Sequence, residues 1–176
     1  MKNFTRLTFV LSAFLIINFG CKNSSNKPQT ESAITEINNQ ATMIENPLNQ
    51  FGKKYAEAWC SQHPDSVAAF FSDSGSLKVN NNEPAVGRAA IAKVAEGFMS
   101  AFPDMIVSMD SLKTTPAGVE FHWTLTGTNT GPNGTGKKVR VSGFELWRFD
   151  EHGLIVQSLG TFDSDEYNRQ LKFGVE

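Results

Sequence analysis

Residues 119–126 read Val-Glu-Phe-His-Trp-Thr-Leu-Thr, with an apolar side chain at every second position. Side chains of a β-strand point alternately to the two faces of a sheet, so this period predicts a strand with one buried face. The glycine-rich segment 131–136 that follows predicts a loop. Beyond it, residues 138–149 and 154–162 predict two further strands, and Glu151-His152-Gly153 predicts the turn between them.

The segments before residue 119 predict one more long strand and two clear helices. Residues 105–115 predict the strand, which a turn at Pro116-Ala117-Gly118 joins to the next. Asn46-Pro47 is a favourable cap and first-turn pair, and the residues after it carry apolar side chains at three- and four-residue spacing, which predicts an amphipathic helix. Residues 88–102 predict another helix with one continuous apolar face, and Pro103 ends it.

Shorter elements complete the predicted domain. His63-Pro64-Asp65 ends the first helix and begins a short second one at residues 66–71. A turn at residues 72–75 then leads to a strand at residues 76–79. Residues 163–171 predict a short closing helix.

Helices followed by consecutive strands predict an α+β domain, with three N-terminal helices packed on one face of a curved antiparallel sheet that forms a cone. Gly143 and Gly160 lie inside predicted strands. They favour either bends and bulges in a curved sheet or close packing against a helix, and the sequence leaves both readings open.

The N-terminus predicts export. Lys2 and Arg6 precede an apolar run at residues 7–19 that is too short to span a bilayer, so residues 1–20 are predicted to be a signal peptide. Gly20 before Cys21 resembles the lipobox of bacterial lipoproteins, which implies a lipid-anchored protein of the cell envelope, periplasmic or surface-exposed. The alternative is ordinary secretion, with Cys21 merely close to the cleavage site.

Composition predicts how the rest of the chain is used. Residues 21–45 are rich in Asn, Ser, Thr, Gln and Glu without a sustained period, which indicates a disordered tether, so the folded domain is expected at residues 46–176. With Cys21 lipidated, Cys60 is the remaining thiol, and its apolar helical setting favours a buried structural residue. The net charge of −2 lacks the basic excess that binds nucleic acid.

Several short segments together resemble the SnoaL-like polyketide cyclase family of the NTF2-like superfamily. The segments are Phe102-Pro103-Asp104, His122-Trp123-Thr124, Thr126-Gly127-Thr128-Asn129-Thr130-Gly131, Phe149-Asp150, Ile155-Val156 and Asp163. They extend over nearly the whole predicted domain, and the resemblance implies an NTF2-like cone around a small-molecule pocket. A homodimer formed through the exposed sheet faces is common in this superfamily and is expected here.

The resemblance implies a role for Asp163. In SnoaL-type cyclases a carboxylate at the end of the last strand acts as general acid and base in an aldol closure, and Asp163 matches that position. An Asp before a helix, with Glu166 three residues later, also fits a helix cap, and both readings stand. Asn129 replaces a His that is common in the family, and His122 stands where Arg is frequent. His122 is a second catalytic candidate or a surface residue.

Two hypotheses about function follow. The first is an acid/base enzyme of the cyclase or isomerase type that acts on a small apolar carbonyl compound; the second is a module that binds such a molecule without turnover. Aromatic and amide side chains are expected to line the pocket, the alternative for each aromatic residue being the core. The candidates are Tyr55, Trp59, Phe102, Trp123, Asn129, Phe144 and Phe162. No cofactor is expected, nor a metal, because no His and carboxylate residues stand at ligand spacing.

Overall fold

The computed structural model describes residues 46–175. The predicted signal peptide at 1–20, Cys21 and the tether at 21–45 lie outside the described residues. Helix α2 (Pro47–Cys60) begins as its sequence indicates, because the Asn46 side chain accepts a hydrogen bond from the Leu48 backbone N–H at 2.9 Å. None of the helices in the described part of the chain has the length and hydrophobicity that a membrane span requires.

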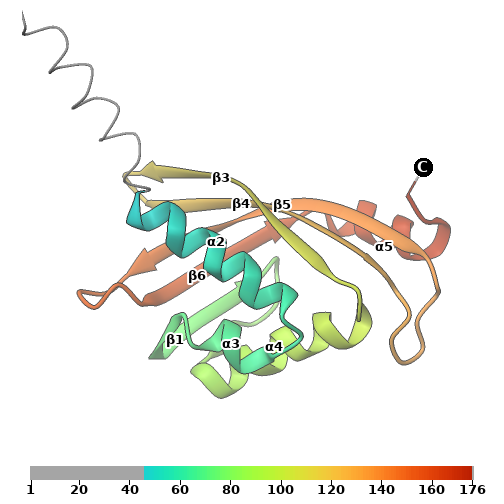
Figure 1. The fold of residues 1–176 in the computed structure, drawn as a ribbon, viewed down its shortest axis with the longest axis horizontal. Helices are drawn as coiled ribbons and strands as arrows, with labels where there is room; N and C mark the ends of the chain where they lie inside the picture. The colour runs from blue at the N-terminus through green and yellow to red at the C-terminus, as the bar shows by residue number, and fades with distance from the viewer. Residues whose placement is uncertain (1–45, 176) are drawn as a thin grey trace, which may run out of the picture. The chain divides into compact units, whose positions relative to one another are not determined.

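Six strands form one sheet in the order β2-β1-β6-β5-β4-β3 (Figure 1). The strands are β1 (Phe71–Val79), β2 (Ala85–Val86), β3 (Ile106–Thr115), β4 (Gly118–Thr128), β5 (Lys138–Phe149) and β6 (Ile155–Phe162). Neighbouring strands run antiparallel except β1 and β6, which pair in parallel. The predicted strands at 105–115, 138–149 and 154–162 are confirmed to within one residue.

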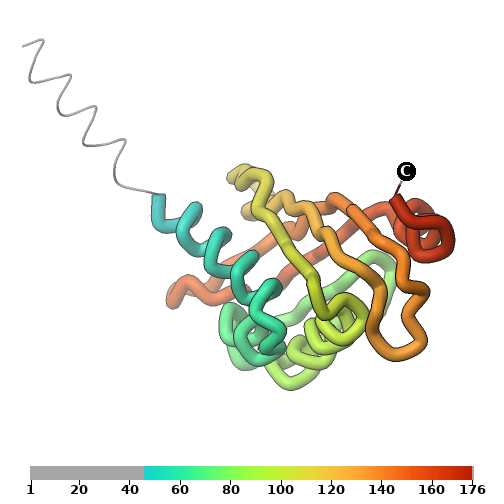
Figure 2. The backbone as a smooth tube through the Cα atoms, turned by 45° about the vertical axis from the view of Figure 1, so that its right-hand side comes forward, coloured from blue at the N-terminus to red at the C-terminus, as the bar shows by residue number. Residues whose placement is uncertain are grey.

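Helices α2, α3 (Pro64–Ala68) and α4 (Arg88–Ala101) cover one face of the sheet, which bends around α2 and α4 in Figure 2. The core between these layers is aromatic. The rings of Phe121 and Trp147 stack at 4.6 Å, and the fully buried Tyr55 of α2 packs edge-on against both rings. The predicted α+β arrangement, three N-terminal helices on one face of a curved sheet, is confirmed, and the parallel β1–β6 pair is the exception to the predicted antiparallel sheet.

The segment around residue 72 was predicted incorrectly. Residues 72–75 form part of β1 and not a turn, and the helix predicted at 66–71 ends at Ala68. The strand begins at Phe71, which is buried, and the ladder to β6 is irregular until Ser76. The polar sequence is extended because neighbouring segments supply its hydrogen bonds, such as the one from the Gly87 N–H to the Gly75 carbonyl.

Gly143 and Gly160 are positions of close packing, but against other strands and not against a helix. The irregularities in strand pairing fall elsewhere, in β1, in β3 and near the end of β5. A Cβ atom at Gly143 would lie 2.8 Å from the Trp123 ring, and one at Gly160 would lie 3.5 Å from Cγ of Glu145. Both glycines therefore make room for large side chains on the helix-covered face of the sheet.

Candidate functional site

A small cavity lies between the helices and the sheet, and we call it the inner chamber. Its volume is about 50 Å³. It is lined by Trp59, Leu77, Val79, Phe98, Val107, Phe121, Trp123, Leu125, Glu145, Gly160 and Phe162. Five of these side chains are aromatic and one is ionisable. The chamber is thus an apolar space with a single carboxyl group in its wall.

Glu145 is that carboxyl group. It lies on β5, opposite Phe121 of β4, and 6% of its surface is exposed. Three side chains donate hydrogen bonds to its Oε2 atom: the Tyr55 hydroxyl at 3.0 Å, the Trp147 indole N–H at 2.9 Å and the Ser158 hydroxyl at 2.6 Å. Within residues 46–175, no group donates to Oε1. One carboxyl oxygen is therefore held by the protein, and the other has no protein partner.

Burial controls the ionisation of this cluster. It raises the pKa of Glu145 above its usual value, and the hydrogen bonds from Ser158, Trp147 and Tyr55 oppose that rise. Burial, and then the negative charge of Glu145, raise the pKa of Tyr55 well above its usual value, so Tyr55 keeps its proton and stays a donor. Relative to a carboxyl group in water, burial therefore shifts Glu145 toward its protonated form.

Trp123 contributes a second polar group. Its ring lies over Gly143, the residue opposite it on β5, and packs edge-on against Phe162 at 6.1 Å. The indole Nε1 atom is buried and has no hydrogen-bond partner among the described residues. An unpaired buried donor costs free energy, so a ligand or water that accepted from it would be stabilised.

The structure brings three of the residues predicted to bind substrate to the chamber: Trp59, Trp123 and Phe162. Tyr55 lies behind the wall and contacts Glu145. Phe102 is fully buried and packs against Tyr167 at 6.3 Å instead.

Two other predicted residues lie away from the inner chamber. Phe144 is the neighbour of Glu145 on β5 and therefore faces the opposite side of the sheet. The Asn129 side chain holds the loop after β4, because its amide donates to the Ala101 carbonyl at 3.1 Å and its oxygen accepts from the Thr135 N–H at 2.8 Å. Neither residue lines the chamber, and substrate binding by either stays a prediction.

His122 also lies on the sheet face that the helices leave uncovered. Its Nε2 atom is 3.0 Å from Oε2 of Glu120, and its ring centroid is 5.5 Å from that of Phe144. It is not part of the chamber lining, and its catalytic role stays a prediction.

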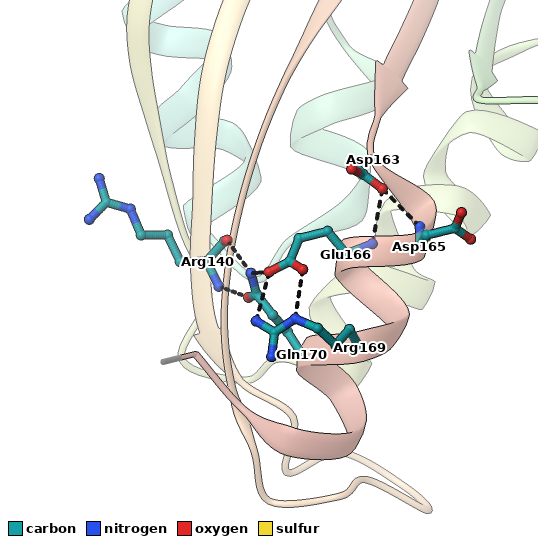
Figure 3. Close-up of polar contacts among 6 residues, drawn as sticks. All are labelled: Arg140, Asp163, Asp165, Glu166, Arg169 and Gln170. Carbon is teal, nitrogen blue, oxygen red and sulfur yellow. Dashed lines mark hydrogen bonds and ion pairs between the residues drawn. The ribbon is translucent and has the colours of Figure 1, made fainter.

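Asp163 caps helix α5 (Ser164–Phe173). Its Oδ1 atom accepts hydrogen bonds from the backbone N–H groups of Asp165 at 3.0 Å and Glu166 at 2.9 Å, as Figure 3 shows. The residue is exposed and does not line the chamber. The cap reading is confirmed, whereas catalysis by Asp163 stays a prediction that this position does not support.

The same close-up shows why α5 is held against β5. The Gln170 amide accepts from the Arg140 backbone N–H at 2.6 Å and donates to the Arg140 carbonyl at 3.0 Å, in the manner of a neighbouring strand (Figure 3). Glu166 is bound by Arg169 and Gln170, which lower its pKa to about 2. This network is structural and lies outside the chamber.

Glu145 is the functional candidate that the sequence reasoning missed. The signal is present in β5, where the helix-facing positions are Val139, Val141, Gly143, Glu145 and Trp147. An acidic residue within an otherwise apolar series at period two indicates a buried polar group. Among the described residues, no group of three or more His, Cys, Asp or Glu side chains is placed to hold a metal ion.

Solved structures share the fold at low sequence identity. A protein with a ketosteroid isomerase-like fold from Catenulispora acidiphila DSM 44928, in complex with trimethylamine, aligns with a TM-score of 0.56 and 15% identity over 66% of this chain and 85% of that one. TsrD from Streptomyces laurentii aligns with a TM-score of 0.61 and 17% identity over 70% and 93% of the two chains. An NTF2-like protein of unknown function from Exiguobacterium sp. 255-15 aligns with a TM-score of 0.54 and 19% identity over 63% and 96%.

Sequence comparison identifies the family. No curated protein matches this chain. The family model described as SnoaL-like polyketide cyclase matches residues 49–171, which include every helix and strand described above except the ends of α2 and α5. The expected family is therefore confirmed, and the chain belongs to the SnoaL-like polyketide cyclase family.

Proposed function

We propose that this domain binds an uncharged carbonyl compound in the inner chamber and that Glu145 exchanges a proton with it. The observation that carries this proposal is the state of the two Glu145 oxygens: Oε2 accepts three hydrogen bonds, and Oε1 has no partner among the described residues. A carboxyl group with one free oxygen at the wall of an apolar cavity has the arrangement that acid/base catalysis requires.

The hydrogen bonds determine which oxygen carries the proton. Trp147 Nε1–H can only donate, and the Tyr55 and Ser158 hydroxyls are placed to donate as well. Oε2 is therefore an acceptor, and the proton of the neutral acid resides on Oε1. Proton exchange with a bound molecule takes place through this one atom.

This arrangement suits a carbon acid. The ionised Oε1 removes a proton from the carbon next to the carbonyl, which breaks the C–H bond and leaves an enolate. The neutral Glu145 then gives a proton back: transfer of the same proton to another carbon gives isomerisation, and replacement of the Oε1 proton by one from solvent before its return to the first carbon gives exchange. Burial raises the pKa of the carboxyl, which makes the carboxylate a stronger base than one in water. Trp123, which lines the chamber and whose buried indole N–H has no partner among the described residues, carries a further hydrogen-bond donor.

Exchange of ketone α-protons with D₂O, followed by ¹H NMR, tests the proposal. The purified protein is expected to accelerate exchange of butanone or hydroxyacetone, and Glu145→Gln to reduce the rate by about 10² to 10⁴, the usual contribution of a general base. Asp163→Asn is the matched control and is expected to retain the wild-type rate. Loss of exchange in Asp163→Asn with retention in Glu145→Gln would assign catalysis to Asp163 instead.

The second candidate function is binding without turnover. Five aromatic rings and one carboxyl group line the chamber, an arrangement that also suits a small alkylammonium ion. The ketosteroid isomerase-like structure from Catenulispora acidiphila was determined with trimethylamine, a ligand of that protein. Calorimetric binding of trimethylammonium that is lost in Glu145→Gln, without exchange of any ketone, would favour this candidate.

We further propose that the protein is exported and anchored to a bacterial membrane through lipid on Cys21. The proposal rests on the basic N-terminus, the short apolar run and Gly20-Cys21. Radiolabelled palmitate is expected to enter the wild-type protein in cells and not the Cys21→Ala variant. Equal labelling of both proteins would show that Cys21 is not the site.

A further inference from the structure

The inner chamber adjoins a larger hollow, which we call the outer groove. The groove has a volume of about 490 Å³. Four residues line both spaces: Leu77 and Val79 of β1, Phe98 of α4 and Phe162 at the end of β6. The two hollows therefore meet along a shared apolar wall.

The volumes restrict what each space can hold. A cavity needs about 10–15 Å³ to hold one water molecule. The chamber, at about 50 Å³, therefore holds a group of only a few heavy atoms. Small-molecule sites commonly measure about 300–1,000 Å³. A ligand of ordinary size that places its carbonyl beside Glu145 needs further space, and the outer groove is the adjoining hollow that shares four lining residues with the chamber.

The rest of the outer groove is polar. Its polar lining includes Asn81, Asn82, Glu83, Ser164, Tyr167 and Asn168. Among the hydrogen bonds of residues 46–175, none involves the side-chain amide of Asn81, Asn82 or Asn168. Asn80 differs, because it donates to the Ser164 hydroxyl at 2.7 Å and accepts from the Phe162 N–H at 2.9 Å. Asn80 supports the wall, while the three free amides can bind a ligand.

The charges around the groove favour a neutral group. Glu83 is the one formally charged residue in its described lining, and no Lys or Arg lines it. Helix α5 begins at the groove, but Asp163 already accepts from the N–H groups of Asp165 and Glu166 that would otherwise attract an anion. A phosphate or carboxylate would therefore meet the negative charge of Glu83 without a compensating cation in the described lining.

We propose that the ligand has two parts: a small carbonyl-bearing end in the inner chamber, and a neutral, hydroxyl-rich part of sugar-like size in the outer groove. Asn81, Asn82 and Asn168 each offer a donor and an acceptor, which matches neighbouring hydroxyl groups. The half-buried Tyr167 lines the groove beside them. The proposal rests on the proposed function, because it takes the inner chamber as the carbonyl site.

Three matched probes test the proposal: 4-hydroxybutan-2-one, its β-glucoside and its phosphate ester. Calorimetry or NMR titration of the purified protein is expected to give at least tenfold tighter binding of the glucoside than of the parent ketone. The phosphate ester is expected to bind no better than the parent. Asn82→Ala and Asn168→Ala are each expected to weaken glucoside binding by about two- to tenfold, the effect of one neutral hydrogen bond, without changing parent binding.

The controls separate this inference from the proposed function. Asn49→Ala removes an exposed amide of α2 that does not line the groove, and it should change neither affinity. The two-part ligand is wrong if the glucoside binds no tighter than the parent ketone. It is also wrong if the glucoside binds Asn82→Ala and Asn168→Ala as tightly as it binds the Asn49→Ala control. Glu145-dependent exchange of the parent ketone would still support the proposed function. Tighter binding of the phosphate ester than of the glucoside would refute the neutral tail.

Discussion

Replacing Glu145 by Gln is expected to change how stability depends on pH. Gln has nearly the same shape, its side-chain oxygen can accept the three hydrogen bonds now made to Oε2, and it does not ionise. The folded pKa of Glu145 is raised, so the folded state holds this proton more tightly than the unfolded state, whose pKa is about 4.3. Its stabilising effect is complete below that pKa and is lost as pH rises through the folded pKa.

The size of the effect follows from the same linkage. Each unit by which the folded pKa exceeds the unfolded one costs about 1.4 kcal/mol once the pH is above both. For a domain of this size, that lowers the melting temperature by about 4–6 °C per unit. Because Glu145 is 6% exposed, solvent provides little screening of this cost.

Thermal unfolding followed by circular dichroism between pH 4 and pH 8 provides the assay. The melting temperature of the wild type should fall relative to that of Glu145→Gln as pH rises. Ser158→Ala, which removes the donor at 2.6 Å, should extend the upper end of this fall by about one to two pH units, since a hydrogen bond to a charged group contributes about 1.5–3 kcal/mol.

The control is Glu151→Gln, whose side chain is 88% exposed and whose difference from the wild type should not vary with pH in this way. A wild-type melting temperature that rises relative to Glu145→Gln with increasing pH would mean that the ionised form of Glu145 is favoured in the folded state. That result would refute the account of the site.

Three further predictions concern packing, capping and assembly. Gly143→Ala should destabilise the domain by about 1–3 kcal/mol in urea unfolding, because its Cβ would clash with the Thr161 backbone carbonyl oxygen and lie 2.8 Å from the Trp123 ring. Gly97→Ala, with open space around it in α4, should instead stabilise the domain by about 0.5–1 kcal/mol; effects of the same sign would contradict this. Asp163→Ala should cost about 1 kcal/mol by removing the α5 cap and leave ketone exchange unchanged, and a stability equal to wild type would count against the cap. We expect light scattering at micromolar concentration to give a dimer and Leu159→Lys, a change on the uncovered sheet face at a residue 38% exposed, to give a monomer; a monomeric wild type would exclude the dimer.

Local patterns in the chain were sufficient for most elements. The alternation at residues 119–126 and 138–149 identifies β4 and β5, because the two faces of those strands meet different environments. Proline and the cap residue Asn46 mark the beginning of α2 in the same way. Residues 72–75 were predicted incorrectly because their polar composition is typical of turns, whereas their extended form is supported by hydrogen bonds from other segments, such as the one from the Gly87 N–H to the Gly75 carbonyl.

The candidate site also depends partly on local sequence patterns and partly on contacts between distant segments. Sequence alone determined the family, the fold class and three aromatic residues of the chamber wall, Trp59, Trp123 and Phe162, because periodicity and short motifs are local properties of the chain. The tertiary structure decided that the Asp163 carboxylate caps helix α5. It also decided that Oε1 of Glu145 lies at an apolar cavity without a hydrogen-bond partner among the described residues. Those facts depend on Tyr55 from α2 and Ser158 from β6, which are 90 and 13 residues from Glu145 and become its neighbours only when the chain folds.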